Sequence, residues 1–389
     1  MDRRPESTAP GLARGAATWL LYGVLACFGF LLNGLGAVLG PLQHDLHVSR
    51  SQVAFYPTLF AIGLLIIGVA GGSLVGRIGR LPALQASLVG MIAGGLLLGT
   101  SQRSLTIFGA LLLGVGGALL IQLLPALLAD LHPGSATAAV GEANGLASAA
   151  SVLGPLAVAG ALTAGLGWQA GYLVAPLVIL AVFLPLTWRI AVPAAPRPTM
   201  IIDAGGAAPL LGRWFEVLLA VSVEFCMVFW AASAVSEWHH ASTARAPAVA
   251  ALFLVGMAGG RSLAVPITRR MTTTHLLMLA CTGVTAVGFA IFWLAPTLWL
   301  AGAGLLIVGS GLALLYPTTV SRTVAAWPHA PDRAAARGAL ASGLAIGGAP
   351  YLLARLADWV GLRRAFLIVP ALLLALGLRV AADYRRRGL

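Results

Sequence analysis

The chain has 389 residues, of which 59% are hydrophobic and only 9% are charged, and its mean hydropathy is +0.93. Soluble domains carry about 25% charged residues, so this composition excludes a soluble protein and indicates one that crosses a membrane many times. All 24 basic residues are arginines, and the net charge is +12. Because these arginines lie at the ends of apolar segments, we predict contact with the lipid bilayer and no nucleic-acid partner.

Twelve apolar segments follow one another, each long enough for a helix across a hydrocarbon core of about 30 Å. The first six lie at about 18–40, 52–75, 82–101, 104–128, 138–162 and 167–191. The second six lie at about 214–237, 247–267, 274–294, 297–320, 334–356 and 362–382. The sequence therefore predicts an all-α polytopic membrane protein with twelve transmembrane helices.

A polar stretch at 192–213, rich in proline, separates the two sets of spans. We interpret it as a cytosolic linker between an N-terminal bundle (18–191) and a C-terminal bundle (214–382), with tails at 1–17 and 383–389. The two halves resemble each other, and residues 167–176 align with 361–370. Such duplication is typical of transporters whose site lies between the halves near the membrane midplane.

The arginines alternate from loop to loop along the chain. If the N-terminus is cytosolic, the outer segments hold only Arg50, Arg103, Arg245, Arg363 and Arg364. This imbalance predicts that both termini are cytosolic. The absence of Lys and the abundance of Ala, Gly and Pro indicate a GC-rich bacterial genome, so we expect a multi-pass protein of the bacterial cytoplasmic (inner) membrane.

The segment between the second and third spans carries a glycine- and arginine-rich motif. It reads Gly72-Ser-Leu-Val-Gly-Arg-Ile-Gly-Arg80. It resembles the G-x-L-x-D-R-x-G-R motif of the major facilitator superfamily (MFS), but has Gly76 where the family has Asp. A degenerate second copy runs from Gly259 to Arg270. The resemblance covers almost the whole chain and implies the MFS fold, two pseudo-symmetric bundles of six helices.

In that superfamily this loop forms a charge-relay latch with neighbouring helix ends, which stabilises the outward-open state. We interpret Glu142, where the fifth span begins, as an acidic residue near the positive N-terminus of a helix, and we expect it to pair with Arg77 across the loops. Arg261 belongs to the latch in this interpretation, although it could instead pair with Glu224 or bind an anionic substrate. The predicted latch comprises Gly72, Arg77, Gly79, Arg80, Glu142, Arg261, Arg269 and Arg270.

Glu224 lies in the middle of a span that begins at Trp214 and ends at Trp238. A charged carboxylate at that depth costs several kcal/mol if it faces lipid, so Glu224 must be neutral, paired or directed into a polar cavity. We predict that Glu224 is the proton-coupling residue and contacts substrate, with Trp230 beside it on the same helix. The alternative is a protonated Glu224 that only holds two helices together.

Three further polar residues lie inside spans that line the central cavity in the superfamily. They are Asn33, Gln122 and Tyr316, in the first, fourth and tenth spans. The resemblance implies that each contacts substrate, and the alternative is a hydrogen bond between helices.

These observations predict a secondary active transporter that moves a small organic solute by alternating access, driven by a proton gradient through Glu224. An incomplete glycine–proline motif at Gly154 and Pro155 is similar to the antiporter motif of the superfamily and favours proton antiport, and hence export, of an amphipathic compound. The alternatives are a proton symporter that imports a sugar, an organic acid or another nutrient, and a membrane receptor that binds a ligand without transport. We expect no enzyme activity, no cofactor, no metal site and a monomeric protein.

Overall fold

The computed structural model describes residues 14–100, 102–189, 208–271, 273–326 and 331–386. Every regular element within these ranges is a helix. Eleven helices are long and apolar enough to cross a membrane, and the bent pair α10 (Arg245–Ser262) and α11 (Ala264–Arg270) completes a twelfth span. The predicted all-α polytopic fold is therefore confirmed.

The N-terminal half contains six spans. They are α1 (Ala16–Leu46), α2 (Arg50–Val53) with α3 (Phe55–Ile78), α4 (Arg80–Leu98), α5 (Arg103–Leu131), α6 (Ala136–Thr163), and a sixth built from α7 (Gly167–Gln169), η1 (Ala170–Val174), α8 (Ala175–Leu186) and η2 (Thr187–Arg189). The short element η1 is a π-helical turn.

The C-terminal half repeats this order. Besides α10 and α11 it contains α9 (Ala208–His239), α12 (Thr274–Leu294), α13 (Leu298–Leu312) with α14 (Leu315–Ala325), α15 (Pro331–Val360), and α16 (Leu362–Ala365) with α17 (Ile368–Arg386). Two boundaries differ from expectation, because α9 already begins inside the expected linker and α17 continues into the expected C-terminal tail. Linker residues 192–207 lie outside the described residues.

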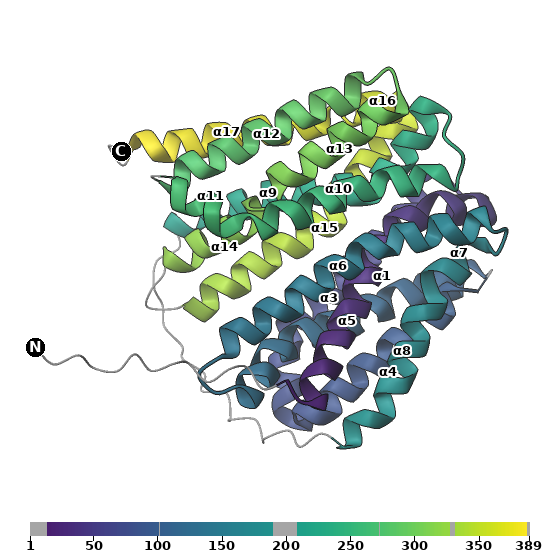
Figure 1. Cartoon of the computed structure of the whole chain (residues 1–389), viewed down its shortest axis with the longest axis vertical. Coiled ribbons are helices and arrows are strands. Elements are labelled where there is room, and N and C mark those ends of the chain that lie inside the picture. The colour runs from purple at the N-terminus through teal and green to yellow at the C-terminus, as the bar shows by residue number, and fades with distance from the viewer. Residues whose placement is uncertain (1–13, 101, 190–207, 272, 327–330, 387–389) are drawn as a thin grey trace, which may run out of the picture.

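The two halves form separate bundles that lie side by side (Figure 1). Their internal packing is alike. In α5, a Cβ added at Gly114 would collide with the backbone of Phe60 in α3; in α13, one at Gly309 would collide with the backbone of Phe253 in α10. Glycine thus lets the second and fourth spans of each half approach closely, which agrees with a duplicated bundle.

The first, fourth, seventh and tenth spans are the innermost. Buried residues make up 67%, 61%, 78% and 61% of their most apolar stretches, compared with 28% in the sixth span and 33% in the twelfth. The halves themselves meet where α3 packs against α15, α6 against α10 and α1 against α9.

Proline explains two of the breaks within the spans of the C-terminal half. Pro317 has no N–H to donate to the carbonyl of Ala313, and the tenth span is interrupted between α13 and α14. Pro266 likewise leaves the carbonyl of Ser262 without its helical donor, and α10 and α11 meet at an angle of 59°. The second break follows directly after Arg261, so it terminates the helix that carries this residue.

Candidate substrate cavity

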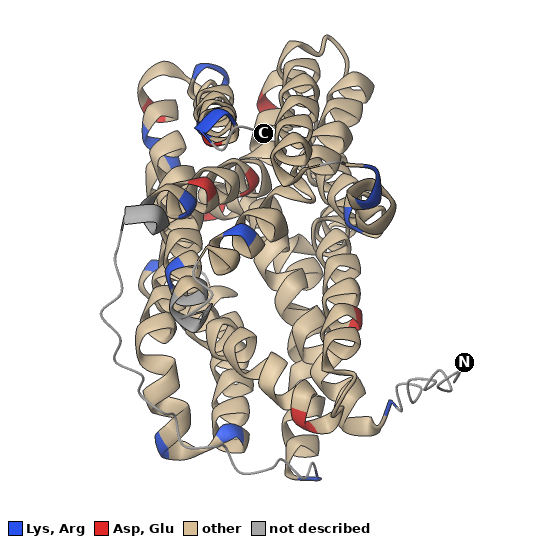
Figure 2. Ribbon diagram, turned by 90° about the vertical axis from the view of Figure 1, so that its left-hand side faces the viewer, with Lys and Arg blue, Asp and Glu red and all other residues tan. Residues whose placement is uncertain are grey.

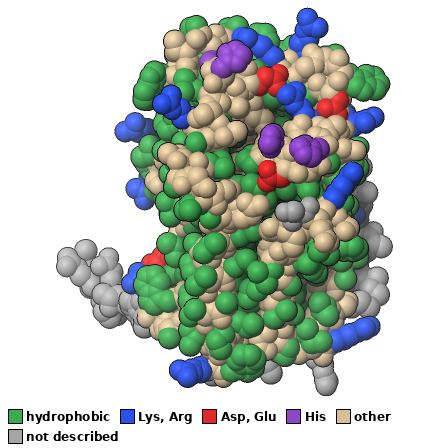
Figure 3. Space-filling view, turned by 90° about the vertical axis from the view of Figure 1, so that its right-hand side faces the viewer, with side chains coloured by type: hydrophobic (Ala, Val, Ile, Leu, Met, Phe, Trp, Pro, Cys, Tyr) green, Lys and Arg blue, Asp and Glu red, His purple; other side chains and the backbone are tan. Residues whose placement is uncertain are grey.

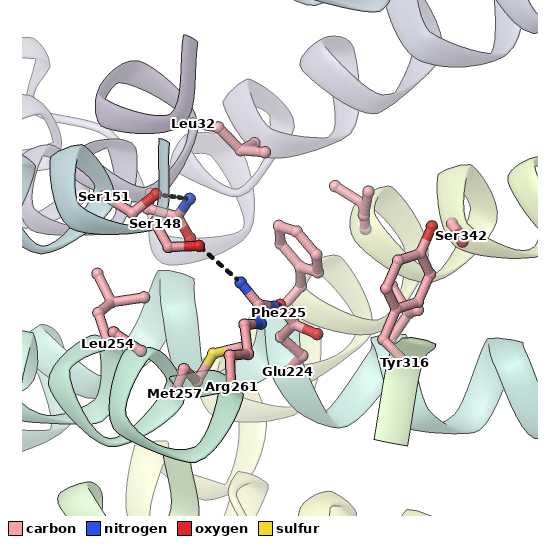
Figure 4. Close-up of a pocket in the computed structure, with 14 residues that line it drawn as sticks. Leu32, Ser148, Ser151, Glu224, Phe225, Leu254, Met257, Arg261, Tyr316 and Ser342 are labelled. Atoms are coloured by element: carbon pink, nitrogen blue, oxygen red, sulfur yellow. Dashed lines mark hydrogen bonds and ion pairs between the residues drawn. The ribbon is translucent and has the colours of Figure 1, made fainter. Parts of the chain in front are cut away.

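A cavity of about 220 Å³ lies between the two bundles (Figure 4). From the N-terminal half it is lined by Leu32 and Asn33 of α1 and by Ser148 and Ser151 of α6. The C-terminal half contributes residues of four helices, α9, α10, α14 and α15. Because both halves form its wall, a movement of one bundle relative to the other must change the cavity's access.

A second hollow of about 650 Å³ continues from this cavity toward one end of the molecule. The two share Ser148, Ala258, Arg261 and Tyr316. Its other walls come from the start of α6 and from the segments around the two helix breaks. Under the predicted topology these helix ends are cytosolic, so the cavity opens toward the predicted cytosolic side.

At the opposite end, contacts between the two halves close the path. Arg50 forms an ion pair with Glu237. The backbone N–H of Ser51 donates to the carboxylate of Asp358 at 3.1 Å, and the rings of Phe55 and Tyr351 lie 5.1 Å apart. Figure 3 shows this face, where charged and histidine side chains gather in the upper part of the view and hydrophobic side chains dominate its lower part.

Glu224 of α9 and Arg261 of α10 are the two charged residues that line the cavity. Arg261 Nη2 lies 3.7 Å from Glu224 Oε1, which is an ion pair but too long for a hydrogen bond. Arg261 Nη1 donates to Ser148 Oγ across the two halves at 3.4 Å. The arginine side chain is 39% exposed and that of Glu224 12%, so this pair is neither buried in the core nor free in solvent.

Two of the polar residues expected to contact substrate also face this cavity. The side-chain amide of Asn33 donates to the carbonyl of Gly29 at 3.1 Å and to Ser151 Oγ at 3.0 Å. Its donors are therefore used, and it offers a solute only its carbonyl oxygen. Tyr316 is 38% exposed and lines both hollows.

The other two expected substrate contacts, Gln122 and Trp230, do not line the cavity. The Gln122 side chain lies against Gly71 of α3, within the N-terminal bundle. Trp230 is 1% exposed, and its indole N–H donates to the carbonyl of Pro350 at 3.0 Å. Trp230 follows Glu224 by six positions, which turns the two side chains about 120° apart on a helix. The structure thus corrects two expectations: Trp230 does not lie beside Glu224, and Gln122 does not line the central cavity.

The expected latch pair between Arg77 and Glu142 is not formed. Glu142 instead accepts hydrogen bonds from Arg14 at 2.6 and 2.9 Å and from Tyr22 at 3.1 Å, because the start of α6 faces the start of α1. Arg77 is exposed.

The remaining latch residues lie at the same end of the molecule. Arg80 forms an ion pair with Asp130 at the end of α5. Gly79 has φ +88° and forms the tight turn into α4, a conformation that favours glycine. Gly72, Arg269 and Arg270 are exposed. Over the described ranges, no ion pair of a latch residue joins the two halves. This agrees with a structure in which the two bundles are separated at their predicted cytosolic ends. The latch itself stays a prediction.

One group of charges was not anticipated from the sequence. Arg213 and Glu216 of α9, Arg322 of α14, His275 of α12 and Asp383 of α17 form a buried cluster in the C-terminal bundle. Figure 2 shows that most of the charged positions lie in the upper part of the molecule, where the C-terminal bundle lies. Arg213 donates to both oxygens of Glu216, at 3.0 and 3.1 Å, and to Asp383 at 2.8 Å. The i,i+3 spacing of Arg213 and Glu216 could have indicated their ion pair from the sequence. The cluster was missed because the predicted C-terminal bundle, 214–382, excluded Arg213 and Asp383.

Two bundles around a central cavity, open at one end and closed at the other, define a transporter of the alternating-access class. Residues 21–350 match the sequence model of the Major Facilitator Superfamily, so the chain belongs to this superfamily. No curated protein sequence matches the chain significantly.

Several solved structures share the fold over nearly the whole chain. A D-xylose–proton symporter has a TM-score of 0.76 at 17% identity, covering 93% of this chain and 96% of its own. A POT family peptide transporter in an autoinhibited state has 0.73 at 14%, covering 96% and 97%. A bacterial homologue of the human lysosomal transporter Spinster, inward-facing and occupied, has 0.72 at 14%, covering 95% and 96%. At these identities the likeness concerns the fold alone.

Proposed function

We propose that this MFS protein is a proton-coupled secondary transporter of a small organic solute, with Glu224 as the residue that carries the proton. The observation that supports this proposal is the position of the Glu224 carboxyl group, which lines the cavity between the halves only 3.7 Å from Arg261. A carboxyl group used merely to join two helices would be expected to form a hydrogen bond with its neighbour, and across the described residues the Glu224 carboxylate accepts none.

In this proposal Glu224 exchanges its proton with the side to which the cavity is open. When the bundles rock, the same carboxyl group faces the other side, so the proton gradient drives the cycle. The proposal places the protein in the cytoplasmic membrane of a bacterium, as a monomer with both termini cytosolic and with no further cofactor.

The direction of coupling is part of the proposal. Arg261 places a positive charge beside Glu224, which disfavours an organic cation that would exchange for the proton. This favours symport over the antiport suggested by the glycine–proline motif of α6. Antiport remains the second candidate because Gly154 of that motif lies in close contact with α1, where a Cβ would approach the carbonyl of Phe30 to 2.7 Å.

The test uses proteoliposomes and a panel of radiolabelled solutes, with and without an imposed pH gradient. We expect the wild type to accumulate its solute when the gradient is present, in the direction that identifies symport or antiport. The Glu224→Gln variant should lose gradient-driven accumulation but keep solute–solute counterflow, because it still binds and rocks. Asp45→Asn, a carboxyl-to-amide substitution at the closed end of α1 and outside the cavity, is the matched control. Undiminished accumulation by Glu224→Gln would remove Glu224 from the mechanism.

A further inference from the structure

We infer that the cavity binds a small organic monoanion, a single carboxylate on an apolar body, and that the guanidinium of Arg261 holds the carboxylate. The inference rests on the proposed function, because it makes the proton on Glu224 the condition for binding.

The first argument is the donor capacity of Arg261. A guanidinium carries five N–H donors in a planar fork that matches a carboxylate. In the described part of the chain Arg261 forms one hydrogen bond, to Ser148 at 3.4 Å, and its ion pair with Glu224 is too long to be a second. Arg213, by contrast, donates three hydrogen bonds at 3.1 Å or less and is 8% exposed. Most donors of Arg261 are therefore available to a ligand.

The second argument is the charge balance of the cavity. Glu224 and Arg261 are its two charged lining residues, and Tyr316 is the remaining titratable one. When Glu224 carries a proton, the cavity has one uncompensated positive charge, which one carboxylate neutralises. A second carboxylate would find no partner in the lining, and an organic cation would be repelled by Arg261.

The third argument is the shape and polarity of the remaining wall. Leu254 and Met257 lie on the same helix as Arg261, and Leu32, Val221, Phe225 and Ile346 complete an apolar lining (Figure 4). The volume of about 220 Å³ is below the roughly 300–1,000 Å³ of pockets that hold drug-sized ligands. A compact apolar body would fill this inner cavity, and a longer one would extend past Arg261 into the second hollow of about 650 Å³.

These three features also determine how the proton and the anion are coupled. An ionised Glu224 attracts Arg261 and repels an incoming carboxylate. Protonation of Glu224 removes both effects, so the anion and the proton bind together and cross together. One anion with one proton carries no net charge, so transport should respond to a pH gradient and not to the membrane potential.

The test measures binding to the full-length, detergent-solubilised protein. The probes are three- to six-carbon 2-keto and 2-hydroxy monocarboxylates, with the matching neutral amides and with succinate as a dianion. We expect at least one monocarboxylate to bind, with about one proton taken up per bound anion in weakly buffered solution, and the amides and succinate to bind at least tenfold more weakly. Charge-assisted hydrogen bonds of this strength predict that Arg261→Gln weakens binding about 10- to 100-fold, with partial recovery in Arg261→Lys.

Glu224→Gln separates this inference from the proposed function. Because Gln resembles protonated Glu, this variant should bind the same monocarboxylate with proton uptake abolished. If proton uptake persists in Glu224→Gln while Arg261→Gln loses binding, the coupling residue is wrong and the anion site stands. If no monocarboxylate binds, if the amides bind as tightly as the acids, or if a correctly folded Arg261→Gln binds like the wild type, the anion site is overturned. Thermal unfolding of each variant verifies its fold.

Discussion

Two kinds of charged group occur in this membrane protein, and their geometry differs. In the cluster around Arg213 and Glu216 the hydrogen-bonded partners meet at 2.7 to 3.1 Å, beside one longer ion pair of 3.6 Å between Arg322 and Glu216, and Glu216 is fully buried. Removing charges from water is costly, and only such close, multiple hydrogen bonds offset that cost. The Glu224–Arg261 pair is longer and reaches solvent through the second hollow. A loose pair can exchange its partner for a ligand, whereas the tight cluster joins four helices of one bundle.

Trp230 was predicted to contact substrate, but its buried indole donates to the carbonyl of Pro350 and does not line the cavity, so we expect a structural role. We predict that Trp230→Phe lowers the stability by about 1–3 kcal/mol, because the buried carbonyl of Pro350 loses its donor and a smaller ring leaves space. Solute binding should change little. The measurement is thermal unfolding in detergent beside a binding assay. Trp299→Phe is the control, since Trp299 is 90% exposed. A large loss of solute binding at unchanged stability would show that Trp230 contacts the substrate.

At the scale of helices, α1 and α9 join the halves at the closed end. Gly36 of α1 lies against the backbone of Val228 of α9, so close that a Cβ would overlap the Val228 carbonyl. Because the two helices belong to different bundles, we expect this contact to separate when the outer end opens. Glycine at position 36 therefore stabilises the outer-closed state relative to the outward-open state.

We predict that Gly36→Ala destabilises the outer-closed state by about 1–3 kcal/mol, as overpacking does elsewhere. The population should shift toward the outward-open state. The readout is labelling by a membrane-impermeant maleimide of a cysteine introduced at Ala232, a buried position in a small hollow beside this contact. The three native cysteines are buried and add little background.

Gly40→Ala is the matched control for this prediction, because it lies on the same helix and a Cβ there meets nothing within 4 Å. It should label like the wild type. Equal labelling of the two variants would show that the α1–α9 contact does not hold the outer end closed.

At the scale of the whole molecule, the structure represents one state of a cycle. Its outer end is held by the Arg50–Glu237 ion pair, the Ser51–Asp358 hydrogen bond and the bond from Thr58 Oγ1 to the carbonyl of Gly347 at 2.9 Å. The ends on the predicted cytosolic side meet less, since the second hollow separates α6 from α10 and α14 there. These few polar contacts are weak enough to be broken in each turnover.

We predict that Glu237→Gln shifts the equilibrium toward the outward-open state by roughly 1.5- to 5-fold, the effect of losing one exposed ion pair. Glu237→Arg should shift it further, and the exchange Arg50→Glu with Glu237→Arg should restore it. Distances between spin labels on α2 and α16 would report the two populations. High salt should reduce the wild-type preference in the same direction. If the exchange variant behaves like Glu237→Arg, the ion pair is not part of the gate.

Much of the architecture followed from local patterns. Twelve apolar segments and the glycine motif around Gly79 were sufficient to predict the fold. In a bilayer each span must be a helix that satisfies its own backbone hydrogen bonds, so a long apolar segment identifies it in the sequence. Depth along a span also singled out Glu224. The limits of α9 and α17 were missed, since charged residues such as Arg213 and Asp383 enter these helices only by pairing with each other across the bundle.

The sequence by itself determined that this is a polytopic α-helical protein of duplicated halves with one carboxyl group deep in a central span. Only the tertiary structure decided which residues meet that carboxyl group. It brought Arg261, Asn33 and Tyr316 to Glu224 and turned Gln122 and Trp230 away. The physical reason is that hydropathy and periodicity are properties of one helix, whereas a site between two bundles depends on how helices far apart in the chain rotate and tilt against each other.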